Sequence, residues 1–510
     1  MTTANLSRIL RWNRYRNEGV VALVFEDRTW TYSQLDDNVD ALAAGLRRLG
    51  VGRGEIVAIL GLNSPEYFMT TLACARLGAV FLPLNYRLHV EEIVYVVEHA
   101  GATVLVTDAD YHDVIAEVAA RVESVRDVIT LHDTAPDGWL TFDDLLGSGA
   151  GQRVDDADVA DDDLQRIMYT SGTTSRPKGA MLTHGNCNAN MDMQVVELNI
   201  RPGQSILVFG PLYHVGGLDI PGFSIWYAGA TMVLMRRFDA RSILEIIDRH
   251  RIVGMTMVAT MVHMIRELPD RREFDTSSVE WMVFSQVAER LFRDTNEVFP
   301  KARLVEGYGL TETCNGISYL DGAHMYAKLG SVGRPTHRVD IRVVDDDDTD
   351  VPVGELGEIV VRGPKVSPGY WRDPDLTAVS HRNGWFHTGD IGRFDEDGYL
   401  YVVDRKKDMI RSGGENLASS EVERVLYDHP AVSEAAVIGV PDERWGEVPR
   451  AFVVLSAGHE LTESDLVEFA AHRLAKFKVP RTVVFVDELP RNPSGKVLKR
   501  ELREMAEEAS

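Results

Sequence analysis

The sequence predicts an α/β protein with a large N-terminal domain of helix-covered, mostly parallel sheets plus a β-rich subdomain, followed by a small mobile α+β C-terminal domain. Short apolar runs alternate with helical patterns through the first two thirds of the chain, as in layered α/β domains. From about residue 339, strand and turn patterns replace long helices, which indicates a β-rich subdomain. A chain of 510 residues is long enough for several such parts.

The N-terminal pattern begins with a strand-like segment at 29–32, which leads into a helical segment at 35–51. A buried-strand run at 56–63, a helical segment at 66–79 and a second strand at 80–84 follow. Strands of this wholly apolar kind are typical of parallel sheets covered by helices on both faces. Further short strands are predicted at 102–107, 205–209, 231–234 and 283–284.

The C-terminal third divides into two patterns. Strand-like segments at 339–348, 357–364 and 385–405 form the predicted β-rich subdomain. After it, two helices alternate with three strands, as in a small α+β domain. We therefore expect a large N-terminal domain at 1–404, with its β-rich subdomain at 339–404, and a small C-terminal domain at 405–510.

Composition excludes several classes of partner. The formal net charge is −24, and an acidic surface repels nucleic-acid backbones. Cys74, Cys187 and Cys314 lack the spacing of a metal site or a disulfide framework, which favours a reducing compartment. No apolar run reaches the length of a signal peptide or a membrane span. We expect a cytoplasmic monomer or homodimer with no nucleic-acid partner and no integral membrane segment.

A hydroxyl- and glycine-rich loop, YTSGTTSRPKG, spans 169–179. Small residues let backbone N–H groups approach an anion, hydroxyls add donors and Lys178 adds positive charge, so the loop predicts a phosphate site. It is not a Walker loop, because Pro177 and Gly179 flank the lysine where that motif has glycine and serine or threonine. Composition alone leaves a mobile surface loop equally open.

Six further motifs accompany this loop and carry a resemblance to a known family. They are PLYHVGG at 211–217, GYGLTET at 307–313, GELGEIVVRGP at 354–364, WFHTGD at 385–390, DRKKDMIRSGGEN at 404–416 and PRNPSGKVLKREL at 490–502. In this order they resemble the adenylate-forming superfamily of acyl-CoA synthetases, peptide-synthetase adenylation domains and beetle luciferases. The resemblance implies that ATP and Mg²⁺ convert a small-molecule carboxylic acid to acyl-AMP with release of pyrophosphate, and that the acyl group then passes to the thiol of coenzyme A.

The resemblance also assigns roles in nucleotide binding. Gly307 and Tyr308 would receive the adenine, Thr311 would donate to the α-phosphate and Glu312 would ligate Mg²⁺, because a hard cation offsets charge that builds on the phosphates. The residues expected to hold the phosphates are Thr170, Ser171, Gly172, Thr173, Thr174 and Lys178.

The C-terminal motifs imply a second set of roles. Asp390, beside Arg405, would accept hydrogen bonds from the ribose hydroxyls. Lys496 would stabilise charge on the carboxylate and α-phosphate during adenylation. Two reactions at one site require the small domain to move, with Lys407 as the hinge and Gly414 lining the passage for the thiol.

The acyl pocket is expected to include His214, Gly309, Ser285 and Gln286. His214 matches a gate residue of the family that also acts in catalysis. The serine and glutamine stand where the family usually has two glycines, so they add bulk and hydrogen-bonding capacity to the pocket floor. This departure favours a small or polar-substituted aromatic acid over a long alkyl chain.

Three functional hypotheses remain. The first is an acid–CoA ligase, favoured by the GGEN and PRNPSGK motifs and by the absence of a carrier-type segment after Lys496. The second keeps adenylation but replaces CoA: the enzyme would load a carrier protein, form an amide with an amine, or activate nitrite for diazotisation of an aryl amine. The third is a non-catalytic nucleotide-binding protein, which conflicts with the presence of Glu312, Asp390 and Lys496 together.

Overall fold

The computed structural model describes residues 4–170, 176–285, 289–320, 322–412, 415–442, 444–456, 458–491 and 497–508. The chain forms two compact units, one of Met1–Ile341 with Val361–Phe386 and one of Arg342–Val360 with His387–Ser510. These units are defined by contacts within the structure and do not test the domain boundary predicted at residue 404, which stays a prediction. In the described residues no helix is both long and apolar enough to cross a membrane.

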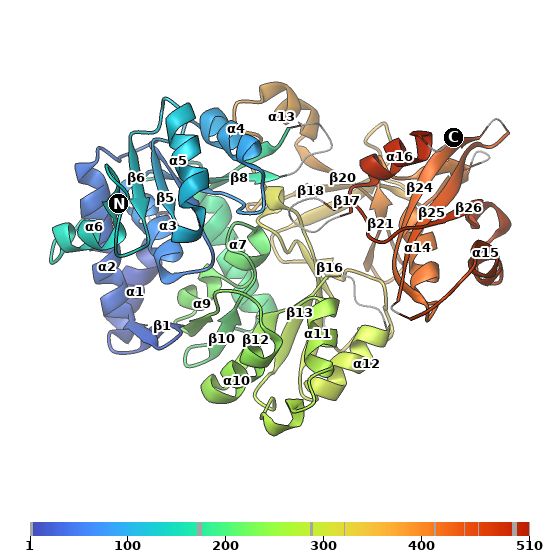
Figure 1. Ribbon diagram of the computed structural model, residues 1–510, viewed down its shortest axis with the longest axis horizontal. Helices are drawn as coiled ribbons and strands as arrows, with labels where there is room; N and C mark the ends of the chain where they lie inside the picture. The colour runs from blue at the N-terminus through green and yellow to red at the C-terminus, as the bar shows by residue number, and fades with distance from the viewer. Residues whose placement is uncertain are drawn as a thin grey trace. The chain divides into compact units, whose positions relative to one another are not determined.

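A nine-stranded sheet forms one layer of the first unit (Figure 1). Its central strands run parallel, and antiparallel strands close both edges. In spatial order the strands are β16 (Arg334–Pro335), β15 (Ser318–Leu320), β14 (Arg303–Tyr308), β13 (Trp281–Phe284), β12 (Ile252–Thr256), β10 (Ser205–Val208), β11 (Thr231–Leu234), β1 (Val21–Phe25) and β2 (Arg28–Thr31).

A seven-stranded sheet forms the other layer, and all of its strand pairs but one are parallel. The exception is β9, which pairs antiparallel with β8. The order is β7 (Leu140–Thr141), β6 (Asp127–Thr130), β5 (Val104–Thr107), β3 (Ile56–Leu60), β4 (Val80–Pro83), β8 (Leu164–Thr170) and β9 (Lys178–Thr183).

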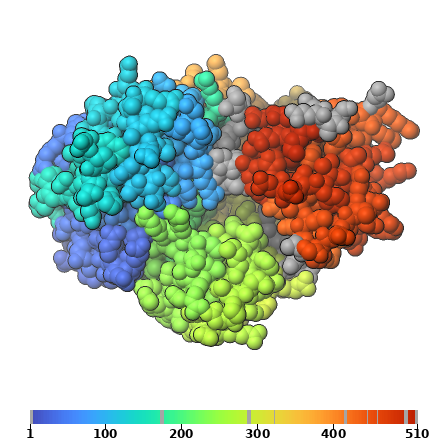
Figure 2. All heavy atoms as spheres, in the orientation of Figure 1, coloured from blue at the N-terminus to red at the C-terminus, as the bar shows by residue number. Residues whose placement is uncertain are grey.

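Helices flank both sheets in the first unit, whose N-terminal residues form the blue-to-cyan surface of Figure 2 and whose later residues form the green surface. Their ends follow local sequence rules: α3, for example, has the cap Ser64, proline at its first position and left-handed Gly78 after its last residue, as expected. The helices are α1 (Arg8–Asn17), α2 (Tyr32–Arg48), α3 (Pro65–Leu77), α4 (Val90–Ala100), α5 (His112–Arg121), α6 (Phe142–Gly149), α7 (His184–Leu198), α8 (Val215–Leu218), α9 (Phe223–Tyr227), α10 (Ala240–His250), α11 (Ala259–Arg266), α12 (Glu289–Val298) and α13 (Pro374–Ser380).

A five-stranded sheet, in which β19 and β21 pair antiparallel with β20, contains the β-rich pattern predicted from residue 339, and the division between the units falls within its strands. A second five-stranded sheet lies wholly in the second unit with helices α14 (Ser419–Tyr427), α15 (Glu463–Ala471) and α16 (Lys499–Glu508). The strands of the two sheets are β17 (Asp340–Val344), β18 (Gly357–Arg362), β19 (His381–Arg382), β20 (Trp385–Phe394) and β21 (Leu400–Arg405), then β22 (Ile410–Ser412), β23 (Glu415–Leu417), β24 (Val432–Asp442), β25 (Gly446–Leu455) and β26 (Thr482–Phe485).

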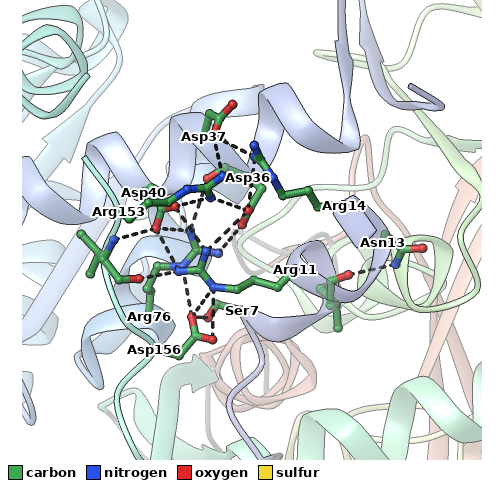
Figure 3. A network of polar contacts seen from close by, with 12 residues as sticks. Ser7, Arg11, Asn13, Arg14, Asp36, Asp37, Asp40, Arg76, Arg153 and Asp156 are labelled. Carbon is green, nitrogen blue, oxygen red and sulfur yellow. Dashed lines mark hydrogen bonds and ion pairs between the residues drawn. The ribbon is translucent and has the colours of Figure 1, made fainter. Parts of the chain in front are cut away.

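The large hydrophobic core lies between the two sheets of the first unit and includes Phe68, Phe223 and Trp226, whose rings pack edge to face. A buried ion-pair network lies beside this core (Figure 3). Its centre is Arg76 of α3, fully buried, which pairs with Asp36 and Asp40 of α2 at 2.7 and 2.8 Å. Arg11, Arg153 and Asp156 join the network from α1 and from the segment after α6.

Candidate active site

The phosphate loop is entered from β8 and left through β9. Thr170 is the last residue of β8 and pairs in register with Lys178, the first residue of β9. The entry is fixed by Tyr169, whose hydroxyl lies 2.6 Å from Nδ1 of His99. Thr170 and Lys178 are therefore held at the two ends of the loop. The other residues predicted to bind phosphate, Ser171, Gly172, Thr173 and Thr174, lie outside the described residues.

The GYGLTET segment leaves the sheet at the end of β14. Gly307 and Tyr308 are its last residues, and a short 3₁₀ helix, η3 (Thr311–Thr313), follows. A Cβ on Gly309 would lie 2.3 Å from the backbone nitrogen of Gly316, so glycine is required where the chain doubles back. The amide of Ile317 closes this fold by donating to the carbonyl of Tyr308 at 2.7 Å.

Three consecutive residues after η3 have positive φ: Cys314 (48°), Asn315 (59°) and Gly316 (40°). Such a run is costly for residues with side chains. The fully buried side chain of Lys365 spans the turn, donating to the Gly316 carbonyl and to Asn190 Oδ1, each at 2.8 Å. Burial lowers the pKa of Lys365 to about 8. The lysine thus anchors the segment that carries Thr311 and Glu312.

The Glu312 side chain is half-buried, and the phenol of Tyr370 orients it. Tyr370 donates its hydroxyl to Oε1 at 2.7 Å, and the amide of Ser367 donates to the Glu312 carbonyl, also at 2.7 Å. In the described residues no cluster of three or more His, Cys, Asp or Glu could cage a metal. Mg²⁺ usually takes one or two carboxylates and completes its shell with phosphates and water, so an oriented carboxylate fits that ion beside a nucleotide.

His214 follows β10 and adopts a defined ring orientation. Its Nδ1 accepts a hydrogen bond from the amide of Gly216 at 3.0 Å. A neutral imidazole that accepts at Nδ1 carries its proton on Nε2. The bond to Gly216 therefore fixes the orientation of the ring.

Ser285 follows the last residue of β13, next to the end of β14, and its side chain is exposed. The parallel strands β10, β12, β13 and β14 end at the same edge of the sheet, which is where open α/β sheets bind ligands. His214, Ser285 and Gly309 therefore follow strands that end at one edge of the sheet, and their role in an acyl pocket stays a prediction. Gln286 lies outside the described residues.

Asp390 and Arg405 belong to the second unit and face each other on neighbouring strands, β20 and β21. Nε of Arg405 lies 2.7 Å from Oδ1 of Asp390, whose side chain is buried. The amide of Asp390 donates to Thr388 Oγ1 at 3.0 Å. The Arg405 guanidinium binds one carboxylate oxygen of Asp390 and so orients that side chain.

The expected hinge residue Lys407 follows β21 and is exposed. Its neighbour Lys406 binds back to the β-rich sheet through Glu358 at 3.2 Å. Lys496 and Gly414, expected in adenylation and in the thiol passage, lie outside the described residues.

Sequence reasoning did not single out Tyr370, which contacts Glu312 of the GYGLTET segment, or Lys365, which contacts Gly316 just after it. They lie in GPKVSPGY, directly after the strand of the GELGEIVV motif. A lysine and a tyrosine in an otherwise apolar and small-residue stretch were the available signal. Their contacts with Gly316 and Glu312 cannot be predicted from sequence spacing, because each contact joins residues about fifty positions apart.

Comparison with known proteins gives the class. The model of the AMP-binding enzyme family matches residues 10–371, and that of the AMP-binding enzyme C-terminal domain matches residues 421–496. The chain is 42% identical to a feruloyl-CoA synthase from an Amycolatopsis species, over 93% of each chain. It is 39% identical to an indoleacetate–CoA ligase from Aromatoleum aromaticum, over 96% of this chain and 95% of that one.

Among solved structures, the chain matches o-succinylbenzoate CoA synthetase from Bacillus subtilis bound to its acyl-adenylate intermediate. The TM-score is 0.87, the identity 32%, and the match covers 97% of this chain and 98% of that one. Fold and comparisons together define an adenylating enzyme that activates a carboxylic acid. The chain belongs to the AMP-binding enzyme family, in its acid–CoA ligase branch, and uses ATP, Mg²⁺ and CoA.

Proposed function

We propose that this ligase activates an aromatic carboxylic acid that carries a polar substituent. The observation that carries the proposal is the similarity, over more than nine tenths of the chain, to two ligases named for feruloyl and indoleacetate substrates. The exposed hydroxyl of Ser285 at the end of β13 supports it, because a polar group in an apolar pocket favours a substrate that can pair with it. Gln286 is proposed as its neighbour in the same role.

In the acyl pocket, we assign His214 to the substrate carboxylate. Its Nδ1 accepts from the amide of Gly216 at 3.0 Å, which fixes the orientation of the ring. A side chain held in one orientation beside a carboxylate directs the attacking oxygen toward the α-phosphorus. Gly309, which tolerates no Cβ, is proposed to form the adjoining wall.

In the nucleotide site of the first unit, Tyr308 with Gly307 is proposed to receive adenine, and Thr311 the α-phosphate. Glu312 would hold Mg²⁺, which neutralises charge on the phosphates when bound. The other phosphate ligands are proposed to be Lys178 and the loop residues Thr170, Ser171, Gly172, Thr173 and Thr174.

In the C-terminal part, Asp390 with Arg405 is proposed to bind the ribose hydroxyls, and Lys496 to stabilise charge at the carboxylate and α-phosphate. We propose domains at 1–404 and 405–510 that rotate about Lys407 between the half-reactions. Gly414 would then line the path of the CoA thiol.

A cytoplasmic monomer or homodimer is the proposed working state. The three cysteines are buried and unpaired, which suits a reducing compartment, and the substrates ATP and CoA suit the cell interior.

The test is pyrophosphate release from MgATP over a panel of benzoates, cinnamates and arylacetates with hydroxy, methoxy or amino groups, beside aliphatic acids of increasing length. Each acid is assayed with and without CoA. We expect substituted aromatic acids to give the highest kcat/KM and steady turnover to require CoA. Preference for palmitate would refute the substrate proposal, and acid-dependent release indifferent to CoA would point to another acceptor.

A further inference from the structure

A single tyrosine touches two charged residues that the proposed function assigns to MgATP. The Tyr370 hydroxyl donates to Glu312 Oε1 at 2.7 Å. The ammonium of Lys178 lies 5.5 Å from the centroid of the same ring, within the range of a cation–π contact. The phenol group and the ring face thus hold an anion and a cation respectively.

The backbone holds this tyrosine in place from several sides. Its amide donates to Thr377 Oγ1 of α13 at 2.9 Å. The residues on either side pair with β9, because Met181 donates to the Gly369 carbonyl at 3.0 Å and Trp371 donates to the Gly179 carbonyl at 2.8 Å. The side chain is 6% exposed. Tyr370 is therefore held in a fixed position between β9, which begins with Lys178, and η3, which contains Glu312.

From this geometry we propose that Tyr370 is a positioning residue of the adenylation half-reaction, which orients the Glu312 carboxylate through its hydroxyl and holds the Lys178 ammonium on its ring. The inference rests on the proposed role of Glu312 as the Mg²⁺ ligand. With Oε1 engaged by the phenol, Oε2 remains for the ion. Hydrogen-bonded partners of this kind fix the orientation of metal-ligating carboxylates.

The ring also acts as a spacer. Lys178 and Glu312 carry opposite charges, and within the described residues no ion pair joins them; both contact Tyr370 instead. A direct pair would engage the carboxylate oxygen that the ion needs and draw the ammonium from the phosphates. Replacing the ring by a smaller side chain removes that separation, whereas phenylalanine removes only the hydroxyl.

The experiment uses the full-length enzyme and measures binding of α,β-methylene ATP, which cannot be cleaved at the bond that adenylation breaks, by titration calorimetry over a range of Mg²⁺ concentrations. For Tyr370→Phe we expect the Mg²⁺ concentration at half-saturation to rise about tenfold, the lower end of the effect of losing such a partner. Nucleotide affinity without Mg²⁺ should stay as in the wild type. Tyr370→Leu should also weaken binding without Mg²⁺, because Lys178 loses its support.

Tyr227→Phe is the matched control. Its phenol donates to Asp192 Oδ1 at 2.5 Å, so the variant loses the same type of bond away from these residues and should keep wild-type Mg²⁺ dependence. Glu312→Gln separates the two proposals. If Glu312→Gln shifts the Mg²⁺ dependence and Tyr370→Phe does not, the proposed role of Tyr370 is wrong. If neither variant shifts it, Glu312 is not the Mg²⁺ ligand, and the role of Tyr370, which rests on that assignment, is refuted as well.

A kinetic measurement gives a second readout. Adenylation by Tyr370→Phe, followed as acid-dependent ATP–pyrophosphate exchange, should recover toward the wild-type kcat at high Mg²⁺. Thioester formation from supplied acyl-AMP should be unchanged, because that step needs no pyrophosphate-bearing nucleotide. A uniform loss of both half-reactions at every Mg²⁺ concentration would indicate a general structural role and overturn the proposal.

Discussion

At the scale of single residues, the segment that carries Thr311 and Glu312, our proposed nucleotide ligands, depends on a buried side chain that has no assigned contact with the substrate. Lys365 spans the positive-φ turn at 314–316 and bonds to the Gly316 carbonyl. A buried ammonium costs desolvation energy, which hydrogen bonds only partly repay. The lysine therefore lowers global stability near neutral pH while it fixes the turn that leads from Thr311 and Glu312.

The Lys365 side chain predicts a specific pH dependence of stability. Burial lowers its pKa from 10.5 to about 8 in the folded protein, so between these values the unfolded chain binds more protons and stability rises with pH. Each pKa unit corresponds to about 1.4 kcal/mol. We expect the free energy of unfolding of the wild type, relative to Lys365→Met, to rise by about 3 kcal/mol between pH 7 and pH 10.

Urea unfolding of the two proteins at matched pH values measures this difference, and the other alkaline titrations cancel in the comparison. If the difference in unfolding free energy between the two proteins stayed constant from pH 7 to pH 10, the pKa of Lys365 would not be lowered in the folded protein. Adenylation by the variant at pH 7 should fall, because the turn at 314–316 loses its anchor.

At the scale of elements, the close return of the chain after β14 depends on glycine. Gly309→Ala would place a Cβ 2.3 Å from the Gly316 nitrogen, so the backbone must shift. We expect an acid-dependent ATP–pyrophosphate exchange rate at least tenfold lower, since misplacement by about 1 Å can cost a hundredfold in rate. Gly147→Ala in α6, where a Cβ meets no atom within 4 Å, is the control and should keep wild-type exchange.

The packing of α1, α2 and α3 depends on the buried network around Arg76 (Figure 3). Arg76→Met leaves Asp36 and Asp40 with less compensation in a buried setting, which costs about 3–5 kcal/mol. Arg153→Met removes a half-exposed partner of the same two carboxylates and should cost about 1 kcal/mol or less. The two urea-unfolding midpoints should separate accordingly, and equal losses would contradict the central role of Arg76.

How far the sequence predicts these elements depends on the range of the interactions. Strands such as β5, β10, β11 and β13 overlap the apolar runs predicted for them, because wholly apolar runs bounded by turns are a local signal. The confirmed α/β class follows from their alternation with helices. The bond from Tyr370 to Glu312 could not be predicted, because it arises where β9, α13 and η3 meet and no local pattern encodes that meeting.

At the scale of the whole molecule, the division of the chain into units follows contacts rather than sequence order. Segment 342–360 joins the C-terminal unit, whereas 361–386, which carries Tyr370, joins the first. The pattern of strands and turns begins near residue 339, as expected. It cannot show which strands pack with which unit, because strand pairing is non-local. The assignment of Asp390 and Arg405 to the second unit is a consequence of that pairing.

The last prediction concerns the use of one chain for two half-reactions. If Lys496 serves only adenylation, Lys496→Ala should lower acid-dependent ATP–pyrophosphate exchange by at least a hundredfold, as removal of one preorganised electrostatic group does. Thioester formation from supplied acyl-AMP and CoA should stay within about threefold of the wild type, because the lysine stabilises charge that develops only in the first step. Arg500→Ala, which removes an exposed cation paired with Glu504, is the matched control and should leave both rates unchanged. Equal losses in both half-reactions for Lys496→Ala would mean that the lysine serves one shared step, and alternation about Lys407 would then lose its support.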